Sequence, residues 1–187
     1  MTLSADTVLA LLYAFDPGDH PDDLASLERT IALLRHGGDP FDRRRYGPGH
    51  ITASAVVLSP TLAEVVLVNH RRVGGWVQPG GHVEPADADL PAAARREVLE
   101  ETGLELSSGT DPPLVRVDVY EIPPAQSEPH HRHYDITLAF CVSSTGPTSS
   151  CDSEWMWGPL DELERFAVDA SLGRSIERAV RCFRHHT

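Results

Sequence analysis

Residues 80–104 read GGHVEPADADLPAAARREVLEETGL, and this stretch carries the strongest structural signal of the chain. Asp89 is placed to cap a helix, Pro91 is tolerated only in a first helical turn, and Gly103 is typical of the residue that follows a helix. The pattern predicts a helix from Asp89 to Thr102, entered from a glycine turn at Gly80 and Gly81.

Three carboxylates lie on one face of this predicted helix. Glu97, Glu100 and Glu101 are spaced i, i+3 and i+4, so their side chains share a single turn. Like charges at these spacings destabilise a helix by about 0.2–0.5 kcal/mol per pair, and a divalent cation would reverse the sign of that effect. Carboxylate ligands of this kind suit Mg²⁺ or Mn²⁺. The alternative is a solvated acidic face that pairs with Arg95 and Arg96.

The run from Arg96 to Leu104, with Gly81 and Asp87 ahead of it, resembles the signature of the Nudix hydrolase family. That signature is G-x5-E-x7-R-E-U-x-E-E-x-G-U, where U is a bulky apolar residue, and REVLEETGL matches its helical part in full. Two departures precede the helix: Asp87 replaces the first glutamate, and the stretch from Gly81 to Arg96 is one residue too long. We expect Asp87 or Asp89 to replace the missing carboxylate and the extra residue to bulge the loop. The stretch from Gly81 to Leu104 is called the box below.

The resemblance covers the chain from about His50 to Leu163. It implies a Nudix α/β/α sandwich with a mixed β-sheet. It also implies an enzyme that uses Mg²⁺ or Mn²⁺ to hydrolyse a diphosphate linkage in a small molecule or nucleotide.

The resemblance further implies which residues perform the chemistry. The expected metal ligands are Glu97, Glu100, Glu101 and the carbonyl of Gly80. Arg96 is expected to hold a box glutamate by charge-assisted hydrogen bonds. The predicted catalytic set contains Arg96, Glu97, Glu100 and Glu154. The general base stays open between Glu97 and the later carboxylates Glu121, Glu128 and Glu154.

Several residues near the box are candidates for substrate contacts. His82 follows the glycine turn directly, and Tyr134 lies where a later strand is predicted to begin. Arg71 precedes the box and is suited to clamp phosphate, although a solvated hairpin turn explains it equally well. Trp76 is suited to stack on a base, with a core position as the alternative.

Other histidines and the cysteines carry weaker signals. His130, His131 and His133 lie between two predicted strands without the spacing of a helical metal motif, so we expect a surface loop. Cys141, Cys151 and Cys182 are odd in number and lack C-x-x-C spacing, which favours ordinary reduced thiols.

Two parts are expected along the chain. Residues 1–48 form an N-terminal helical extension, with a first helix capped by Asp6 and a second marked by apolar residues from Leu24 to Leu34. Residues 49–187 form the Nudix domain. Its predicted strands are Ile51–Leu58, Ala63–Asn69, Val115–Ile122, Tyr134–Val142 and Glu154–Trp157, and a terminal helix follows.

Composition bounds the class of protein. The chain has 187 residues, 41% of them apolar, so one domain with a real core is expected. The net charge of −12, with arginine as the only basic residue type apart from histidine, disfavours DNA or long RNA as a partner. No long apolar run or basic leader is present, so a cytoplasmic protein without a membrane partner is expected.

Two alternatives to a hydrolase remain open, and so does a homodimer. One alternative is a ligand-binding regulator of the same fold without turnover, against which the full set of box glutamates argues. The other is a diphosphate isomerase of the same fold, and its only support is the position of Cys141 on a predicted strand.

Overall fold

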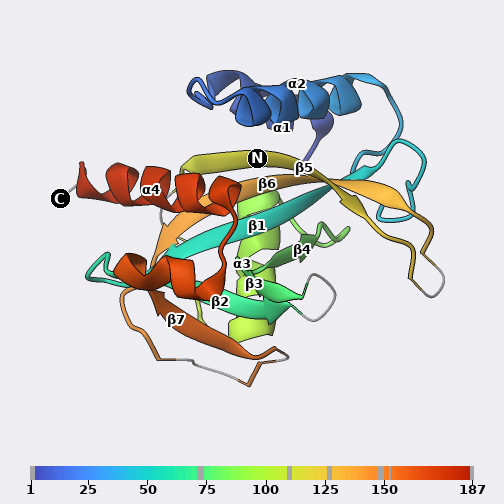
Figure 1. Ribbon diagram of the computed structural model, residues 1–187. Coiled ribbons are helices and arrows are strands. Elements are labelled where there is room, and N and C mark those ends of the chain that lie inside the picture. The colour runs from blue at the N-terminus through green and yellow to red at the C-terminus, as the bar shows by residue number, and fades with distance from the viewer. Residues whose placement is uncertain are drawn as a thin grey trace.

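The computed structural model describes residues 3–70, 74–108, 111–125, 128–146, 150–151 and 153–185. Its elements are α1 (Ala5–Ala14), α2 (Pro21–Arg35), β1 (His50–Leu58), β2 (Glu64–His70), β3 (Gly75–Val77), β4 (Gly80–His82), α3 (Leu90–Thr102), β5 (Leu114–Ile122), β6 (His131–Cys141), β7 (Trp155–Pro159), the 3₁₀ helix η1 (Leu160–Phe166) and α4 (Ala170–Arg184). In Figure 1, α3 lies behind the sheet, α4 lies in front of it, and α1 and α2 cover its upper edge.

The sheet is mixed and is built around β1. Strand β6 runs parallel to β1 along its whole length, from His50 opposite His133 to Leu58 opposite Cys141. Strand β5 pairs antiparallel with β6, and β4 pairs antiparallel with the middle of β1. At the other end β2 joins β1, and β2 also carries β3 and β7. The two ends of β1 therefore face different environments.

Alternation along the strands separates two faces of the sheet. The first, called the α3 face, presents Ile51, Ala53, Ala55 and Val57 of β1 to the apolar side of α3 and to the N-terminal helices. The second, called the α4 face, is apolar only toward the far end of β1, where Val56 and Leu58 pack beneath α4.

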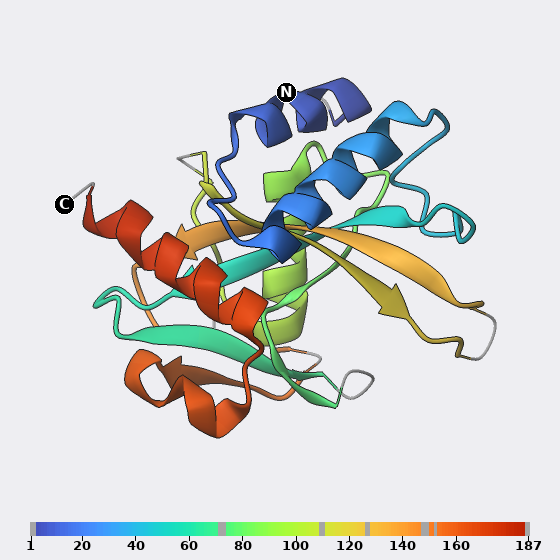
Figure 2. The same ribbon diagram turned by 45° about the horizontal axis from the view of Figure 1, so that its top comes forward.

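Figure 2 shows the α1–α2 hairpin lying across β5 on the outside of the α3 face. Val8, Leu12, Leu33 and Leu34 are buried there in the same core cluster as α3. The first helix is capped by Ser4, whose side chain accepts from the Thr7 amide in a capping box. The expectation of a cap at Asp6 is therefore wrong; Asp6 lies in the first turn.

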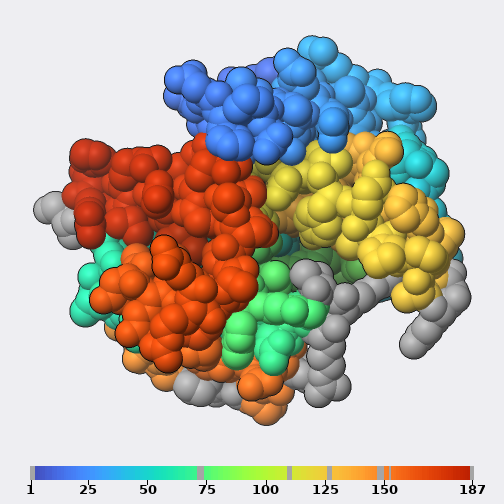
Figure 3. All heavy atoms as spheres, viewed as in Figure 1, coloured from blue at the N-terminus to red at the C-terminus, as the bar shows by residue number. Residues whose placement is uncertain are grey.

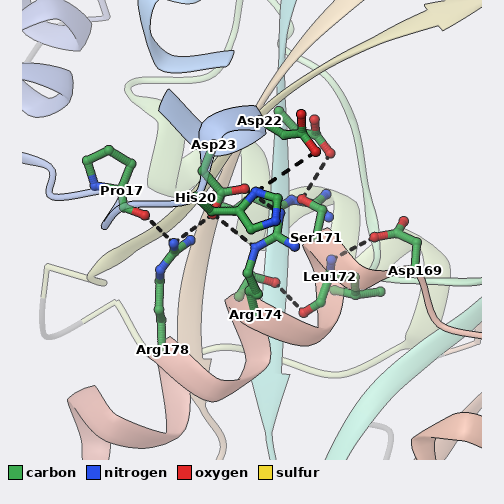
Figure 4. A network of polar contacts seen from close by, with 12 residues as sticks. Pro17, His20, Asp22, Asp23, Asp169, Ser171, Leu172, Arg174 and Arg178 are labelled. Atoms are coloured by element: carbon green, nitrogen blue, oxygen red, sulfur yellow. Dashed lines mark hydrogen bonds and ion pairs between the residues drawn. The ribbon is translucent and has the colours of Figure 1, made fainter. Parts of the chain in front are cut away.

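A buried carboxylate ties the N-terminal helices to α4 (Figure 4). Asp23 on α2 accepts hydrogen bonds from Arg174 and Arg178 of α4, and Arg178 also donates to the carbonyls of Pro17 and Val115. Burial alone would raise the pKa of Asp23, but the two arginines outweigh it and lower that pKa. The contact links residues far apart in the chain.

Within the described ranges, no helix is both long and apolar enough to cross a membrane.

Candidate active site

Strand β4 approaches its neighbours too closely for side chains at either glycine. A Cβ on Gly80 would lie 2.2 Å from Ser54 Oγ on β1. A Cβ on Gly81, which faces the other way, would lie 2.6 Å from Glu97 Oε2 on α3. The missing side chains thus let the backbone of β4 lie directly against the carboxylates of α3.

The box helix has the predicted boundaries. Asp89 is its N-cap and accepts from the Ala92 amide at 2.8 Å, and Gly103 ends it in the left-handed conformation at φ 71°. Asp89 is therefore occupied as a cap, which leaves Asp87 as the residue that replaces the missing carboxylate.

Arg96 connects the loop, β4 and α3. Its Nε and Nη2 donate to both oxygens of Asp87, at 3.1 and 2.9 Å, and Nη2 also donates to the His82 carbonyl at 2.8 Å. Its Nη1 donates to Glu97 at 2.8 Å and reaches Glu100 at 3.4 Å. Burial raises the pKa of Asp87, but the bonds from Arg96 and from the Glu84 amide outweigh burial and lower that pKa. The longer loop still brings a carboxylate to this arginine.

The three box glutamates lie in different surroundings. Glu97 is 14% exposed and Glu100 is 50% exposed, while Glu101 accepts a 3.0 Å hydrogen bond from the Gly80 amide. Burial, with smaller contributions from Glu97 and Glu100, raises the pKa of Glu101 to about 7. Burial also raises the pKa of Glu97, against the opposing effect of Arg96. The negative charges of these groups are thus costly in the absence of a cation.

This arrangement fits a divalent cation with oxygen ligands. Each box glutamate uses one oxygen in the contacts above, and among the described residues its second oxygen accepts no hydrogen bond. Three carboxylates beside a glycine backbone form a donor set suited to Mg²⁺ or Mn²⁺, which prefer carboxylates, carbonyls and waters.

The structure places some of the other predicted site residues near the box and others apart from it. His82 is half-buried on β4, immediately after Gly81. Trp76 on β3 packs edge-on against Phe166, with ring centroids 6.2 Å apart, within the cluster beneath α4. Glu154 is exposed, and Asn69 Nδ2 donates to it at 2.9 Å. No hydrogen bond or ion pair among the described residues joins Glu154 to the box glutamates.

Tyr134 lies on the α3 face, not on the side of the sheet that His82 faces. It is 7% exposed and lines a cavity of about 690 Å³ together with Arg29, Leu33 and Arg132. The prediction for Arg71 falls outside the described residues. Cys141 lies at the end of β6 opposite Leu58, whereas Gly80 pairs with Ser54, so the structure does not bring this thiol to the box.

The expectation of a surface loop agrees with His130, which is exposed before β6, but is wrong for His131 and His133. His131 is 3% exposed, and β6 begins at this residue, three positions before the predicted start. The parallel register then sets His133 beside His50 at the start of β1. Sequence reasoning missed this grouping because it depends on which strands are neighbours.

A buried polar network adjoins these histidines on the α4 face. Asp135 is fully buried and accepts from Thr52 and Ser54 at 2.8 Å each, and from Arg116 at 3.2 Å. Thr137 adds a further bond at 2.9 Å. These hydrogen bonds to Asp135 join β1, β5 and β6 next to β4.

The model of the NUDIX domain matches residues 48–179. A Bacillus subtilis (strain 168) protein named "Putative 8-oxo-dGTP diphosphatase" is 35% identical over 78 residues. The match covers 42% of this chain and 48% of that protein, so it spans about half the length of this curated relative.

Solved structures show the same fold at lower identity. A NUDIX family hydrolase from Clostridium perfringens has a TM-score of 0.51 at 17% identity, covering 72% of this chain and 97% of that one. The MutT protein from Bacillus halodurans has a TM-score of 0.51 at 19% identity, covering 70% and 81%. The NUDIX domain of Shewanella oneidensis NrtR, solved with ADP ribose, has a TM-score of 0.51 at 18% identity, covering 71% and 87%. The predicted fold class is confirmed, and because the family model matches well over half of its residues, the chain belongs to the NUDIX family.

Proposed function

We propose that this chain is a pyrophosphohydrolase that uses Mg²⁺ or Mn²⁺ to cleave the diphosphate linkage of a small nucleotide. The observation that carries the proposal is the grouping of Glu97, Glu100 and Glu101 against the Gly80–Gly81 backbone, each with an oxygen left for a cation. NUDIX family hydrolases are pyrophosphohydrolases and generally use divalent metal ions, which agrees with this donor set.

In this proposal Glu97, Glu100, Glu101 and the Gly80 carbonyl hold the metal. A bound divalent cation neutralises diphosphate charge and lowers the pKa of bound water. Arg96 fixes the carboxylate of Glu97 through its Nη1 bond and keeps the loop in place through Asp87, so it is a positioning residue.

A carboxylate must accept the proton of the attacking water. Glu97 is the first candidate because it lies at the box and burial raises its pKa, which makes it a better base than an ordinary glutamate. Glu154 is the second candidate, and its Asn69 contact would orient it. The rate of Glu154→Gln across pH separates the two, because Glu154 holds no metal in this proposal: loss of the acidic limb in this variant identifies Glu154 as the base, and an unchanged profile leaves Glu97.

The substrate class rests on the named relative, so 8-oxo-dGTP is the first compound to test. His82 and Trp76, with Arg71, are the proposed substrate contacts, although the side chain of His82 lies on the α4 face and Trp76 packs in the cluster beneath α4. Tyr134 would need a substrate that reaches the α3 face. We further propose that residues 49–187 form the catalytic domain and residues 1–48 an extension of it.

The test is a screen of small diphosphate compounds, including 8-oxo-dGTP and ADP-ribose, with detection of phosphate and nucleotide products. Activity is expected with Mg²⁺ or Mn²⁺ and is lost in excess EDTA. Glu101→Gln should reduce kcat by at least about 10²-fold, the scale for removal of a positioned electrostatic element. Full activity in EDTA, or an unchanged rate in Glu101→Gln, would refute the proposal.

A further inference from the structure

His50 is a buried side chain whose ring nitrogens make no well-formed hydrogen bond. It is fully buried at the start of β1, where the Arg45 backbone makes only a weak polar contact with the ring and the other close neighbours are histidine rings. A neutral imidazole carries one donor and one acceptor, and burying either without a partner costs about 1–3 kcal/mol. A buried imidazole with no well-formed hydrogen bond calls for an explanation, and one explanation is that the ring binds a ligand.

The sheet register places two more histidines beside this ring. His133 is the partner of His50 across the parallel β1–β6 pair, so both side chains leave the same face of the sheet. His82 on β4 pairs with Thr52, two residues after His50, and therefore leaves that face too. The face is the α4 face, at the end of β1 away from the apolar cluster beneath α4. Three adjacent strands thus contribute one imidazole each.

The three rings form a nearly equilateral triangle. Ring centroids lie 4.8 Å apart for His50 and His133, and 5.1 Å apart for each of these rings and His82. One nitrogen from each ring lies within 4.8 Å of the others. Zinc-bound imidazoles with Zn–N distances of about 2.0–2.1 Å hold their nitrogens about 3.3 Å apart. Metal binding would draw the three nitrogens together from the separations seen here.

A fourth histidine orients the group. Nδ1 of His131 lies 2.7 Å from the Pro129 carbonyl and therefore carries the proton, which leaves Nε2 as its acceptor. That Nε2 lies 3.1 Å from His133 Nε2. Contacts of this kind fix the ring orientation of metal-binding histidines.

We propose that His50, His82 and His133 bind one transition-metal ion of the zinc class, at a site separate from the box carboxylates. Imidazole nitrogens suit Zn²⁺, Co²⁺ and Ni²⁺, whereas Mg²⁺ prefers oxygen. Three protein ligands, two of them half-buried, leave one coordination position open toward the surface. Structural zinc sites have four protein ligands, whereas sites that bind water or substrate have three. With the molecule drawn as spheres, the surface is hollowed in front of β4, below β5 (Figure 3).

The histidine site goes beyond the proposed function, and the two sites are neighbours. Arg96 donates hydrogen bonds to Glu97 and Asp87 and also to the carbonyl of His82. The backbone of β4 therefore supports the box, while the side chain of His82 belongs to the histidine site. Gly81 faces Glu97 on one side of β4, and the side chain of His82 points to the opposite side. The donor sets share no residue, and variants can remove them one at a time.

The test is a titration of the chelator-treated full chain with Co²⁺, followed through its visible ligand-field bands, with Zn²⁺ added as competitor. The intense visible bands typical of low coordination number should saturate at one Co²⁺ per chain, because Co²⁺ held by the box carboxylates and waters contributes only weak bands, and Zn²⁺ should displace the Co²⁺ that produces the intense ones. His82→Gln and His133→Gln should each weaken binding by at least about 100-fold, because a ligand is lost outright. Glu101→Gln should leave the bands unchanged.

His130→Gln is the matched control, because His130 is an exposed neighbour that pairs with Glu121 and lies outside the triangle. Near-UV circular dichroism in chelator checks that each variant is folded. If His50→Gln does not fold, the half-buried His82 decides the question. The proposal is overturned if the wild-type chain binds Co²⁺ and Zn²⁺ no tighter than about 10 µM. It is equally overturned if His82→Gln and His133→Gln bind as tightly as His130→Gln, or if Glu101→Gln abolishes the bands.

Discussion

Arg96→Ala should destabilise the metal-free protein by about 3 kcal/mol. The substitution removes both bonds to Asp87, the bond to Glu97 and the bond to the His82 carbonyl. The Asp87 side chain is only 6% exposed, so it would remain as a buried charge without a cationic partner, held only by the Glu84 amide. Loss of one partner of a fully buried pair costs about 3–5 kcal/mol. The lower end applies here because the Arg96 side chain is 22% exposed.

A double-mutant cycle with Asp87→Asn isolates the ion pair from the other contacts. Once Asp87 is neutral, Arg96→Ala should cost only about half as much, which gives a coupling of about 1.5 kcal/mol, within the range for directly paired residues. The measurement is urea unfolding near pH 7 in excess chelator. Arg95→Ala is the matched control, since Arg95 donates to the Ser107 carbonyl and lies over the Phe140 ring; its cost should stay below about 1 kcal/mol.

The same variants in Mg²⁺ connect the stability measurement with the proposed metal site. A cation at the box glutamates takes over part of the charge compensation that Arg96 supplies, so Mg²⁺ should reduce the cost of Arg96→Ala. A coupling below about 0.5 kcal/mol would show that Asp87 and Arg96 act independently and that the lengthened loop has not replaced the missing carboxylate. A cost for Arg95→Ala equal to that of Arg96→Ala would show that the loss is not specific to the box.

The remaining predictions concern the box charge and the N-terminal helices. Glu101→Gln should keep or raise the metal-free melting temperature, because it relieves repulsion within the turn; a clear drop would contradict a cation site. Asp23→Asn should lower the free energy of unfolding by about 2 kcal/mol near neutral pH, since it weakens the bonds from Arg174 and Arg178. The folded-state pKa of Asp23 is lowered, so its stabilisation is complete above the unfolded value near 3.8 and is lost as pH falls through the folded pKa. Wild-type and variant unfolding curves should therefore converge only below about pH 4, and a constant difference down to pH 2 would be inconsistent with this pairing. Deleting residues 1–35 should expose the α3 face and cause aggregation in light scattering, whereas a soluble and fully active truncation would show that α1 and α2 are dispensable.

Local signals in the sequence were sufficient for the box helix. Asp89 and Gly103 mark its ends, and the i, i+3, i+4 spacing of its glutamates depends only on helical geometry. The choice between Asp87 and Asp89 needed the structure, because both residues suit either a cap or a salt bridge. Once Asp89 accepts the Ala92 amide, Asp87 alone can reach Arg96.

Features that depend on contacts between strands or between distant helices were beyond the sequence. The pairing of Asp23 with α4 joins residues about 150 positions apart, and no spacing rule relates them. The histidines illustrate the same limit more sharply. His130, His131 and His133 attracted attention as a cluster because they are consecutive or nearly so, yet His130 is exposed and precedes β6, while His131 and His133, two residues apart on the strand, share one face. The grouping proposed to hold one ion takes His133 from that run and adds His50 and His82, each from a different strand. Because β1 lies between β4 and β6, its own histidine becomes the buried centre and the other two its half-buried flanks. Strand order, rather than residue spacing, therefore determines which histidines meet.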